Sequence, residues 1–325
     1  MINAKTFCGG CSVFCILLAL ALFADPSSVV GQKPIVALKQ DLSIGVEDGD
    51  ESLMFGSINR IDLDENGNIY VLDYKFRKIR IFNPEGQSIR AIQVPAGQGP
   101  NEAVNLSGIA VTPSGILFVN DTRKVIVYGF DGRFLRSFLV DFHISSIGCP
   151  GTEELVAIGP HQGKILHVFD QSGKLLDSFG DVFPVPSELE PFKEMPMLAA
   201  PLLFNCGKDG RVFVLNPHKY EISIFKNRRL EQLLPGKSEL FHPVQQRGRA
   251  MISTAAQIVQ SGDLVFVVFQ NPDPKAMKKM DVFRGGLQIG TQDVAGTPFA
   301  VDSQGRLYFA EDELFLRIRR YRINE

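Results

Sequence analysis

Short apolar stretches separated by glycine-containing turns recur along almost the whole chain. In a typical unit the stretch INRIDL from Ile58 leads through a turn at Gly67 into a second stretch, IYVLD from Ile69. Alternation with a period of two residues predicts a strand with one buried face, and the intervening glycine turn predicts a hairpin. Units of this kind begin at Ile58, Leu106, Ile144, Pro201, Ala255 and Thr297.

A second hairpin follows most of these units, as in KIRIFNPEGQSIRAI from Lys78. Four strands in a repeat of about fifty residues predict the blade of a propeller. A single blade cannot bury both of its faces, whereas six blades packed radially give every sheet two neighbours. The predicted fold class is therefore all-β, a six-bladed β-propeller with four-stranded antiparallel blades.

The two ends of the repeat array predict how the ring closes. The last unit ends with LRIRRYRIN, which supplies a third strand but no fourth, and the stretch from Lys33 to Ile44 supplies an unpaired one. We expect this N-terminal strand to complete the last blade, which removes an open sheet edge. The segment from Pro184 to Pro201 does not follow the repeat pattern, and we interpret it as an inter-blade loop. Ser187 and Glu190 are expected to cap a short helix within it.

The first thirty residues have the pattern of a secretory signal. Lys5 precedes the apolar run CILLALALF, which is too short to span a bilayer. We predict a signal peptide at 1–31, a propeller domain at 32–325, a secreted or periplasmic location, and no transmembrane anchor after processing. Of the cysteines, only Cys149 and Cys206 follow the predicted cleavage site, and neighbouring blades diverge enough that a bridge between them is the less favoured state.

Composition narrows the classes of partner and of propeller. The formal net charge of −2 gives no general attraction to nucleic acid, and the absence of Trp excludes WD repeats. The units DENGNIYVLDYKFRKIRIFNPEG and TPSGILFVNDTRKVIVYGFDG resemble NHL repeats. The segment GQGPNE from Gly97 is similar to a GxGPGE linker of bacterial six-bladed propellers related to NHL proteins, with Asn101 at the position of a glycine. The resemblance implies a fold and leaves the reaction open.

One face of the predicted ring carries titratable side chains at matching positions. In each blade the loop after the second strand and the linker to the next blade emerge on the same face. Aligned strand ends place one such residue in every blade: Asp73, Asp121, His161, His218, Asp273 and Asp312. We take these six residues as the candidate ligand-binding face.

Two interpretations of this set compete. The combination of His161, His218 and Asp273 contains ligand types that Zn accepts, and the carboxylates alone would suit Ca, so a divalent metal is a candidate cofactor. The alternative is structural, because an Asp at the end of a strand caps turns by accepting backbone N–H bonds. His143, His167 and His242 are scattered by the alignment and are not taken as ligands.

The sequence favours a non-catalytic function. No HExxH, GxSxG, Walker or surviving CxxC motif is present. We expect a monomeric binding or scaffold module for a protein, peptide or glycan of the cell envelope. The alternative is a metal-dependent lyase or a lactonase-type hydrolase at the mouth of the central channel. In that case, metal at His161 and His218 would activate water or polarise a carbonyl group.

Overall fold

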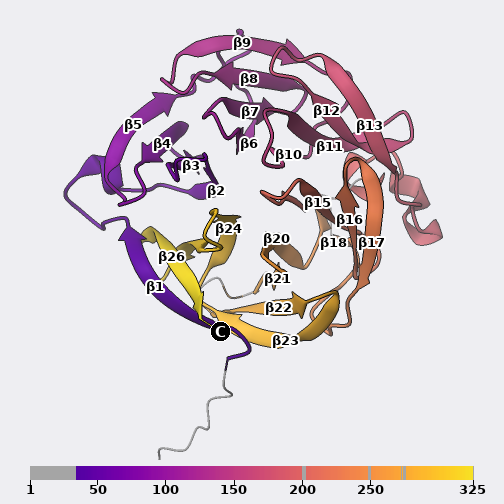
Figure 1. Ribbon diagram of the computed structural model, residues 1–325. Coiled ribbons are helices and arrows are strands. Elements are labelled where there is room, and N and C mark those ends of the chain that lie inside the picture. Colours follow the sequence, from indigo (N-terminus) through magenta and orange to yellow (C-terminus); the bar gives the residue numbers. More distant parts are fainter. Residues whose placement is uncertain (1–33, 200–202, 248–249, 272, 274–275, 325) are drawn as a thin grey trace, which may run out of the picture. The chain divides into compact units, whose positions relative to one another are not determined.

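The computed structural model describes residues 34–324, with the exception of 200–202, 248–249, 272 and 274–275. The described chain forms six four-stranded antiparallel sheets arranged radially around an axis (Figure 1). The predicted six-bladed propeller is confirmed. The predicted signal peptide lies outside the described residues, and none of the helices in the described part is long and apolar enough to cross a membrane.

The first three blades follow one another along the chain, with the first strand of each nearest the axis (Figure 1). Blade 1 contains β2 (Ile58–Leu63), β3 (Ile69–Asp73), β4 (Lys78–Phe82) and β5 (Ser88–Gln93). Blade 2 contains β6 (Leu106–Val111), β7 (Leu117–Asp121), β8 (Lys124–Tyr128) and β9 (Phe134–Leu139). Blade 3 contains β10 (Ser146–Gly148), β11 (Leu155–His161), β12 (Lys164–Phe169) and β13 (Leu175–Asp181).

The remaining blades repeat this order, except for the last. Blade 4 contains β14 (Phe204–Cys206), β15 (Arg211–Leu215), β16 (Glu221–Lys226) and β17 (Arg229–Pro235). Blade 5 contains β20 (Ala255–Ser261), β21 (Leu264–Phe269), β22 (Lys278–Arg284) and β23 (Leu287–Val294). Blade 6 contains β24 (Thr297–Val301), β25 (Leu307–Asp312), β26 (Leu316–Asn324) and, as its outer strand, β1 (Ala37–Ile44).

The N-terminal strand closes the ring as predicted. β1 pairs antiparallel with β26, from Ala37 opposite Asn324 to Ile44 opposite Ile318. Asp41 reinforces the closure by accepting hydrogen bonds from Arg320 Nε at 2.7 Å and Arg322 Nε at 2.6 Å. Burial alone would raise the pKa of Asp41, but these two guanidinium groups outweigh burial and lower it. The two ends of the described chain are therefore held together by backbone pairing and by ion pairs.

The hydrophobic core of the propeller lies between the blades. In the described chain, each pair of neighbouring blades encloses its own cluster of buried apolar side chains. Between blades 6 and 1, for example, Tyr308 and Ile318 pack against Ile69 and Phe82. Burial of this kind contributes roughly 1.5–3 kcal/mol for each large side chain. Since every blade has two such interfaces, the core continues around the ring.

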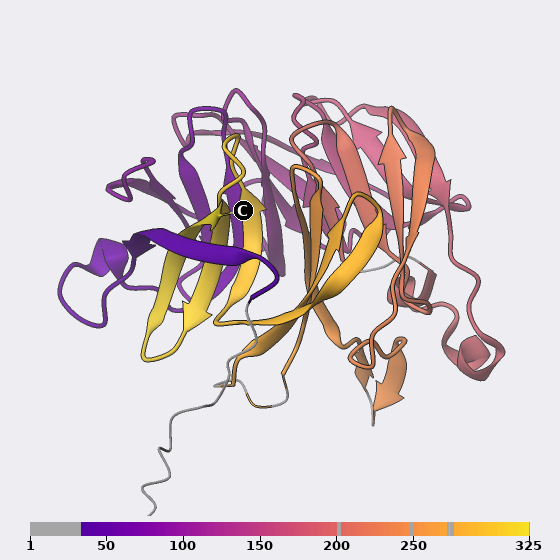
Figure 2. The ribbon, with the colours of Figure 1, turned by 60° about the horizontal axis from the view of Figure 1, so that its bottom comes forward.

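The two faces of the propeller differ in their connections. One face carries the turns between first and second strands, such as the turn at Gly67, and we call it the glycine-turn face. The other, the linker face, carries the longer connections, which contain η1 (Glu51–Leu53), η2 (Ser187–Phe192), α1 (Pro196–Ala199), β18 (Gln245–Arg247) and β19 (Ala250–Ile252). In Figure 2 the segment with η2 and the hairpin of β18 and β19 lie below the blades, at the lower right.

The insertion between blades 3 and 4 forms the predicted short helical segment, but the predicted cap is wrong. Pro186 occupies the N-cap position of η2, and no side chain caps it, because Ser187 already lies in the first turn. Leu189 of η2 and Leu198 of α1 instead pack with Val244, which belongs to the next linker. Apolar contacts between two linkers therefore hold this insertion in place.

Candidate functional site

The residues of the predicted ring lie at the linker face, and Asp73 has a structural role there. Its carboxylate accepts hydrogen bonds from the backbone N–H groups of Gly56 at 3.0 Å and Ser57 at 3.1 Å, just before β2 begins. Arg80 Nε donates to the same carboxylate at 3.2 Å, and its other nitrogens bind carbonyl groups of the linker that contains η1. Asp73 is fully buried and fixes the entry of the chain into blade 1.

Asp121 repeats this arrangement in blade 2. It accepts from the backbone N–H groups of Val104 at 2.9 Å and Asn105 at 2.7 Å, immediately before β6. Lys124 lies 3.8 Å from the carboxylate and donates to the carbonyl group of Gly99 in the glycine-rich linker. The structural interpretation of the strand-end Asp, that it caps the turn with backbone N–H bonds, is confirmed for both residues.

His161 lies at the end of β11 against other aromatic rings. Its ring stacks on Phe142 at a centroid distance of 5.3 Å, and Nε2 is 3.5 Å from Asp141 Oδ1. His167, which the strand alignment separates from His161, lies only 5.7 Å from it, ring to ring. Both nitrogens of His167 are engaged, with Ser178 Oγ at 2.9 Å and the carbonyl oxygen of Gly159 at 3.0 Å. Burial lowers the pKa of His167, so the neutral ring is favoured.

His218 holds the insertion between blades 3 and 4. Its Nε2 lies 2.7 Å from the carbonyl oxygen of Leu198 in α1, so Nε2–H donates and Nδ1 is left as the acceptor. His218 therefore offers a buried lone pair on Nδ1 that has no partner among the described residues.

The remaining ring members are Asp273 and Asp312. The backbone N–H of Asp273 donates to Asn271 Oδ1 at 3.0 Å, and Asp312 ends β25 with its side chain exposed. Within the described residues, no three His, Cys, Asp or Glu side chains form a group that could hold a metal ion. The metal site at His161, His218 and Asp273 stays a prediction.

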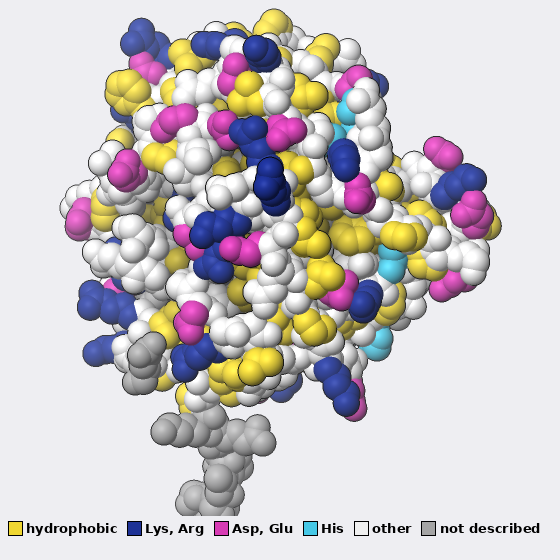
Figure 3. All heavy atoms as spheres, turned by 45° about the vertical axis from the view of Figure 1, so that its right-hand side comes forward, with side chains coloured by type: hydrophobic (Ala, Val, Ile, Leu, Met, Phe, Trp, Pro, Cys, Tyr) yellow, Lys and Arg dark blue, Asp and Glu magenta, His cyan; other side chains and the backbone are white. Residues whose placement is uncertain are grey.

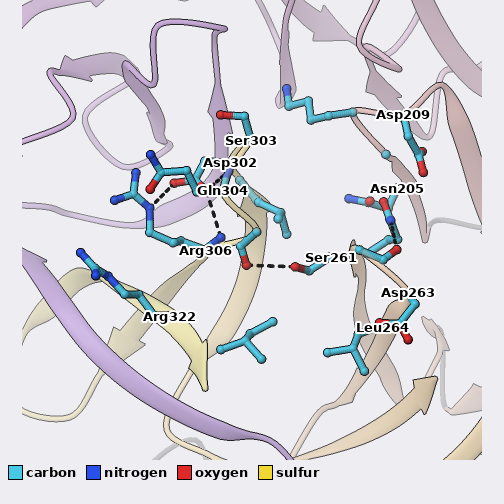
Figure 4. A pocket seen from close by; sticks show the side chains of 18 of the residues that line it. Asn205, Asp209, Ser261, Asp263, Leu264, Asp302, Ser303, Gln304, Arg306 and Arg322 are labelled. Carbon is cyan, nitrogen blue, oxygen red and sulfur yellow. Dashed lines mark hydrogen bonds and ion pairs between the residues drawn. The ribbon is translucent and has the colours of Figure 1, made fainter. Parts of the chain in front are cut away.

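A large hollow lies on the opposite, glycine-turn face, at the mouth of the central channel. This mouth pocket has a volume of about 850 Å³ and lies among the turns of blades 4, 5 and 6 (Figure 4). Its lining is mostly polar: Asp62, Asn205, Lys208, Asp209, Gln260, Ser261, Asp263, Asp302, Ser303, Gln304, Arg306, Arg322 and Asn324. The sequence offered no local motif for it, because each blade contributes only a few residues.

Most charges of the mouth pocket are already paired. Arg306 Nε binds Asp302 at 2.6 Å, and the two residues lie side by side in Figure 4. Lys208 extends from blade 4 to blade 1, where Nζ donates to the carbonyl group of Leu63 at 2.9 Å and lies 3.5 Å from Asp62 Oδ1. Burial lowers the pKa of Lys208, but the Asp62 carboxylate outweighs burial and raises it above the ordinary value.

A smaller hollow of about 60 Å³, the axial cavity, lies on the propeller axis. The first strands of all six blades contribute to its lining: Arg60, Ile109, Ser146, Asn205, Gln257 and Phe299. It shares Asp62, Asn205, Cys206 and Phe299 with the mouth pocket, so the two hollows adjoin. The sequence contains one indication of this cavity. Arg60 and Asp62 are polar residues at alternate positions of β2, so their side chains share the face of the strand that lines the channel.

The cysteines that follow the predicted cleavage site are free thiols at the wall of this cavity. Cys149 is buried, and Cys206 is partly buried. Burial is the main cause that raises the pKa of both thiols above the ordinary value. Both side chains are therefore uncharged at neutral pH and behave as small apolar groups.

Comparison with known proteins supports the architecture. Residues 48–157 match the model of the DUF5128 family, described as a 6-bladed beta-propeller. This match covers blades 1 and 2, the first strand of blade 3 and the start of its second strand. No curated protein matches the sequence.

Solved structures extend the similarity to most of the chain. A protein from Bacteroides fragilis that is named as an exported protein is 14% identical, with a TM-score of 0.60 over 90% of this chain and 96% of that one. A DUF4221 family member from Bacteroides vulgatus is 13% identical, with a TM-score of 0.57 over 89% and 99%. Virginiamycin B lyase from Staphylococcus aureus is 14% identical, with a TM-score of 0.51 over 80% and 78%. At these identities the similarity establishes the propeller fold and leaves the function open.

Proposed function

We propose that this protein is an exported propeller with NHL-like repeats that binds, without catalysis, a peptide or glycan segment of the cell envelope, either free or displayed on a protein. The site of binding is the mouth pocket. Two observations support export, namely the signal-like N-terminus and the similarity to a protein named as exported. The observation that carries the proposal is the polar pocket at the channel mouth.

The size and lining of the mouth pocket suit a short polar segment. Its volume of about 850 Å³ lies in the range of small-ligand sites, roughly 300–1,000 Å³. The Asn205 amide has no hydrogen-bond partner among the described residues, and Ser303 and Gln304 are exposed at the rim. Hydroxyl and amide groups of this kind bind sugar hydroxyls or peptide groups directly.

The proposal is tested by filling the pocket. Arrays of bacterial polysaccharide fragments and synthetic peptides are probed with the mature protein, and the best binder is measured by calorimetry. The variant Gln304→Trp places a large ring in the mouth pocket, and we expect it to weaken binding at least tenfold. Asn66→Trp is the matched control, because Asn66 precedes the equivalent turn glycine in blade 1, outside the pocket. Equal binding by both variants would place the ligand elsewhere.

A metal-dependent lyase or hydrolase is the second candidate function. The buried Nδ1 of His218 without a described partner is the observation that favours it, and the fold similarity to virginiamycin B lyase is compatible with it. A bound divalent ion would activate water or polarise a carbonyl group. Elemental analysis of the mature protein tests this candidate: a stoichiometric Zn or Ca content that is lost in His161→Ala and His218→Ala would support it, and metal-free protein would contradict it.

A further inference from the structure

Arg60 is an unusual cation because it lies inside the channel with few partners. Its Nη2 donates to Ser146 Oγ at 3.3 Å, and the guanidinium group lies 5.8 Å from the ring centre of Phe299. Among the described residues, no carboxylate forms an ion pair with it. A guanidinium group has five N–H donors, so most of them remain available in the axial cavity. Burial lowers the pKa of Arg60, yet arginine stays protonated in proteins.

Neutral hydrogen-bonding groups surround the same cavity. Ser146 and Gln257 are 4% and 3% exposed, and both line the cavity together with Asn205. Asn205 also lines the mouth pocket, so the cavity and the pocket adjoin at this residue. A planar cation with hydroxyl and amide groups beside it is the arrangement that binds a planar anion through paired hydrogen bonds.

The charge balance and the volume select the kind of anion. Asp62 lies two residues from Arg60 on β2 and faces Lys208, so the three side chains together carry one net positive charge. One negative charge neutralises this set, whereas a phosphate dianion would leave it with a net negative charge. A volume of about 60 Å³ equals the liquid volume of about two waters, which is room for a carboxylate group but not for a sugar ring.

We propose that the axial cavity binds a carboxylate group, with Arg60 as its main partner, and that the rest of the ligand lies in the mouth pocket. This inference rests on the proposed function and narrows it to an acidic ligand, such as a peptide C-terminus or a uronic acid residue. The carboxylate would replace water next to Arg60 and gain charge-assisted hydrogen bonds.

The experiment uses acetate as the probe, with the mature protein labelled with ¹⁵N-arginine. The Nε–H signal of Arg60 is assigned by its loss in Arg60→Gln. We expect acetate to shift this signal saturably and neutral acetamide to leave it unchanged. In calorimetry, acetate binds at least tenfold more weakly to Arg60→Gln than to the unaltered protein. Arg133→Gln removes the same charge from an exposed turn and serves as the control with unchanged binding.

Three results would overturn the inference. In the first, acetate does not shift the Arg60 signal. In the second, inorganic phosphate binds as tightly as acetate, and in the third, Arg60→Gln binds acetate with unchanged affinity. The acetate and acetamide titrations need no variant, so the test remains decisive if Arg60→Gln does not fold. A ligand that binds the mouth pocket with equal affinity in Arg60→Gln would leave the proposed function intact and refute the carboxylate site.

Discussion

Lys208 of blade 4 reaches Asp62 of blade 1, with Nζ 3.5 Å from Oδ1, so a single side chain connects two blades that are not neighbours in the ring. The contact crosses the mouth of the channel directly beside the axial cavity. Because Lys208 also donates to the carbonyl group of Leu63 at 2.9 Å, its ammonium group is held in this position by two acceptors. The Lys208 side chain is therefore a fixed part of the mouth-pocket wall.

The Lys208–Asp62 pair is expected to contribute modestly to stability. The side chains are 36% and 21% exposed, so solvent screens their attraction, and a double-mutant cycle with Lys208→Met and Asp62→Asn should give a coupling of about 0.5–1 kcal/mol. Urea denaturation in low and high salt measures it, and the coupling should shrink in 1 M salt. Since the folded-state pKa of Lys208 is raised, the contribution is present below pH ~10.4 and is lost above it. A salt-independent coupling would contradict this account.

Asp73→Asn should destabilise the protein strongly. Asp73 is fully buried, accepts two backbone N–H bonds and pairs with Arg80, and loss of its charge leaves the Arg80 guanidinium without its buried partner. We expect a loss of about 3–5 kcal/mol in the free energy of unfolding. Asp312→Asn is the matched control at the equivalent, exposed position of blade 6 and should change stability by less than about 0.5 kcal/mol. Comparable losses in both variants would argue against a clamp specific to Asp73.

The burial of His167 leads us to expect that the stability of the protein depends on pH. Burial lowers its pKa in the folded state, so the folded protein binds fewer protons than the unfolded chain. The stability that depends on the neutral ring is therefore fully present above pH ~6.5 and is lost as the pH falls through and below that value. The ring of His161 faces His167 and lowers the pKa of His167 further, whereas Asp141 raises it. Urea denaturation at pH 8 and pH 5 should show a smaller loss in His167→Gln than in the exposed control His143→Gln.

The fold was predictable because its signals are local. Strand alternation, turn glycines and the unpaired strand before Ile44 each follow from a few consecutive residues. The positions of Asp73 and Asp121 were predictable for the same reason, since both end a second strand. The closeness of His161 and His167 was not, because it depends on a register shift in β11 between Ile158 and His161, which alignment of strand ends cannot detect.

The mouth pocket and the axial cavity were not predicted from the sequence, although the polar residues Arg60 and Asp62 at alternate positions of β2 were a signal for the cavity. Their residues come from the turns and first strands of separate blades, so their proximity is a product of ring closure and not of spacing. Repeat alignment favoured the linker face, where one titratable residue recurs in every blade. In blades 1 and 2 that recurrence has a structural cause, because the carboxylate fixes the start of the first strand. A residue that recurs in every repeat can thus have a purely architectural role. Arg60 does not belong to the set of aligned strand-end residues, so the repeat alignment did not identify it.

Arg60 should lower the stability of the unliganded protein. The Arg60 guanidinium group is partly withdrawn from water and has one hydrogen bond, to Ser146, so its desolvation costs free energy that its partners do not fully offset. We therefore expect Arg60→Met to raise the free energy of unfolding by about 1 kcal/mol, as is common when a binding residue is replaced. Arg133→Met, at an exposed turn, should change it by less than about 0.5 kcal/mol. The contrary result is a destabilisation of the protein by more than about 1 kcal/mol in Arg60→Met. In that case the contacts of Arg60 with Ser146 and Phe299 stabilise the fold. The presence of Arg60 in the cavity would then be explained without a ligand.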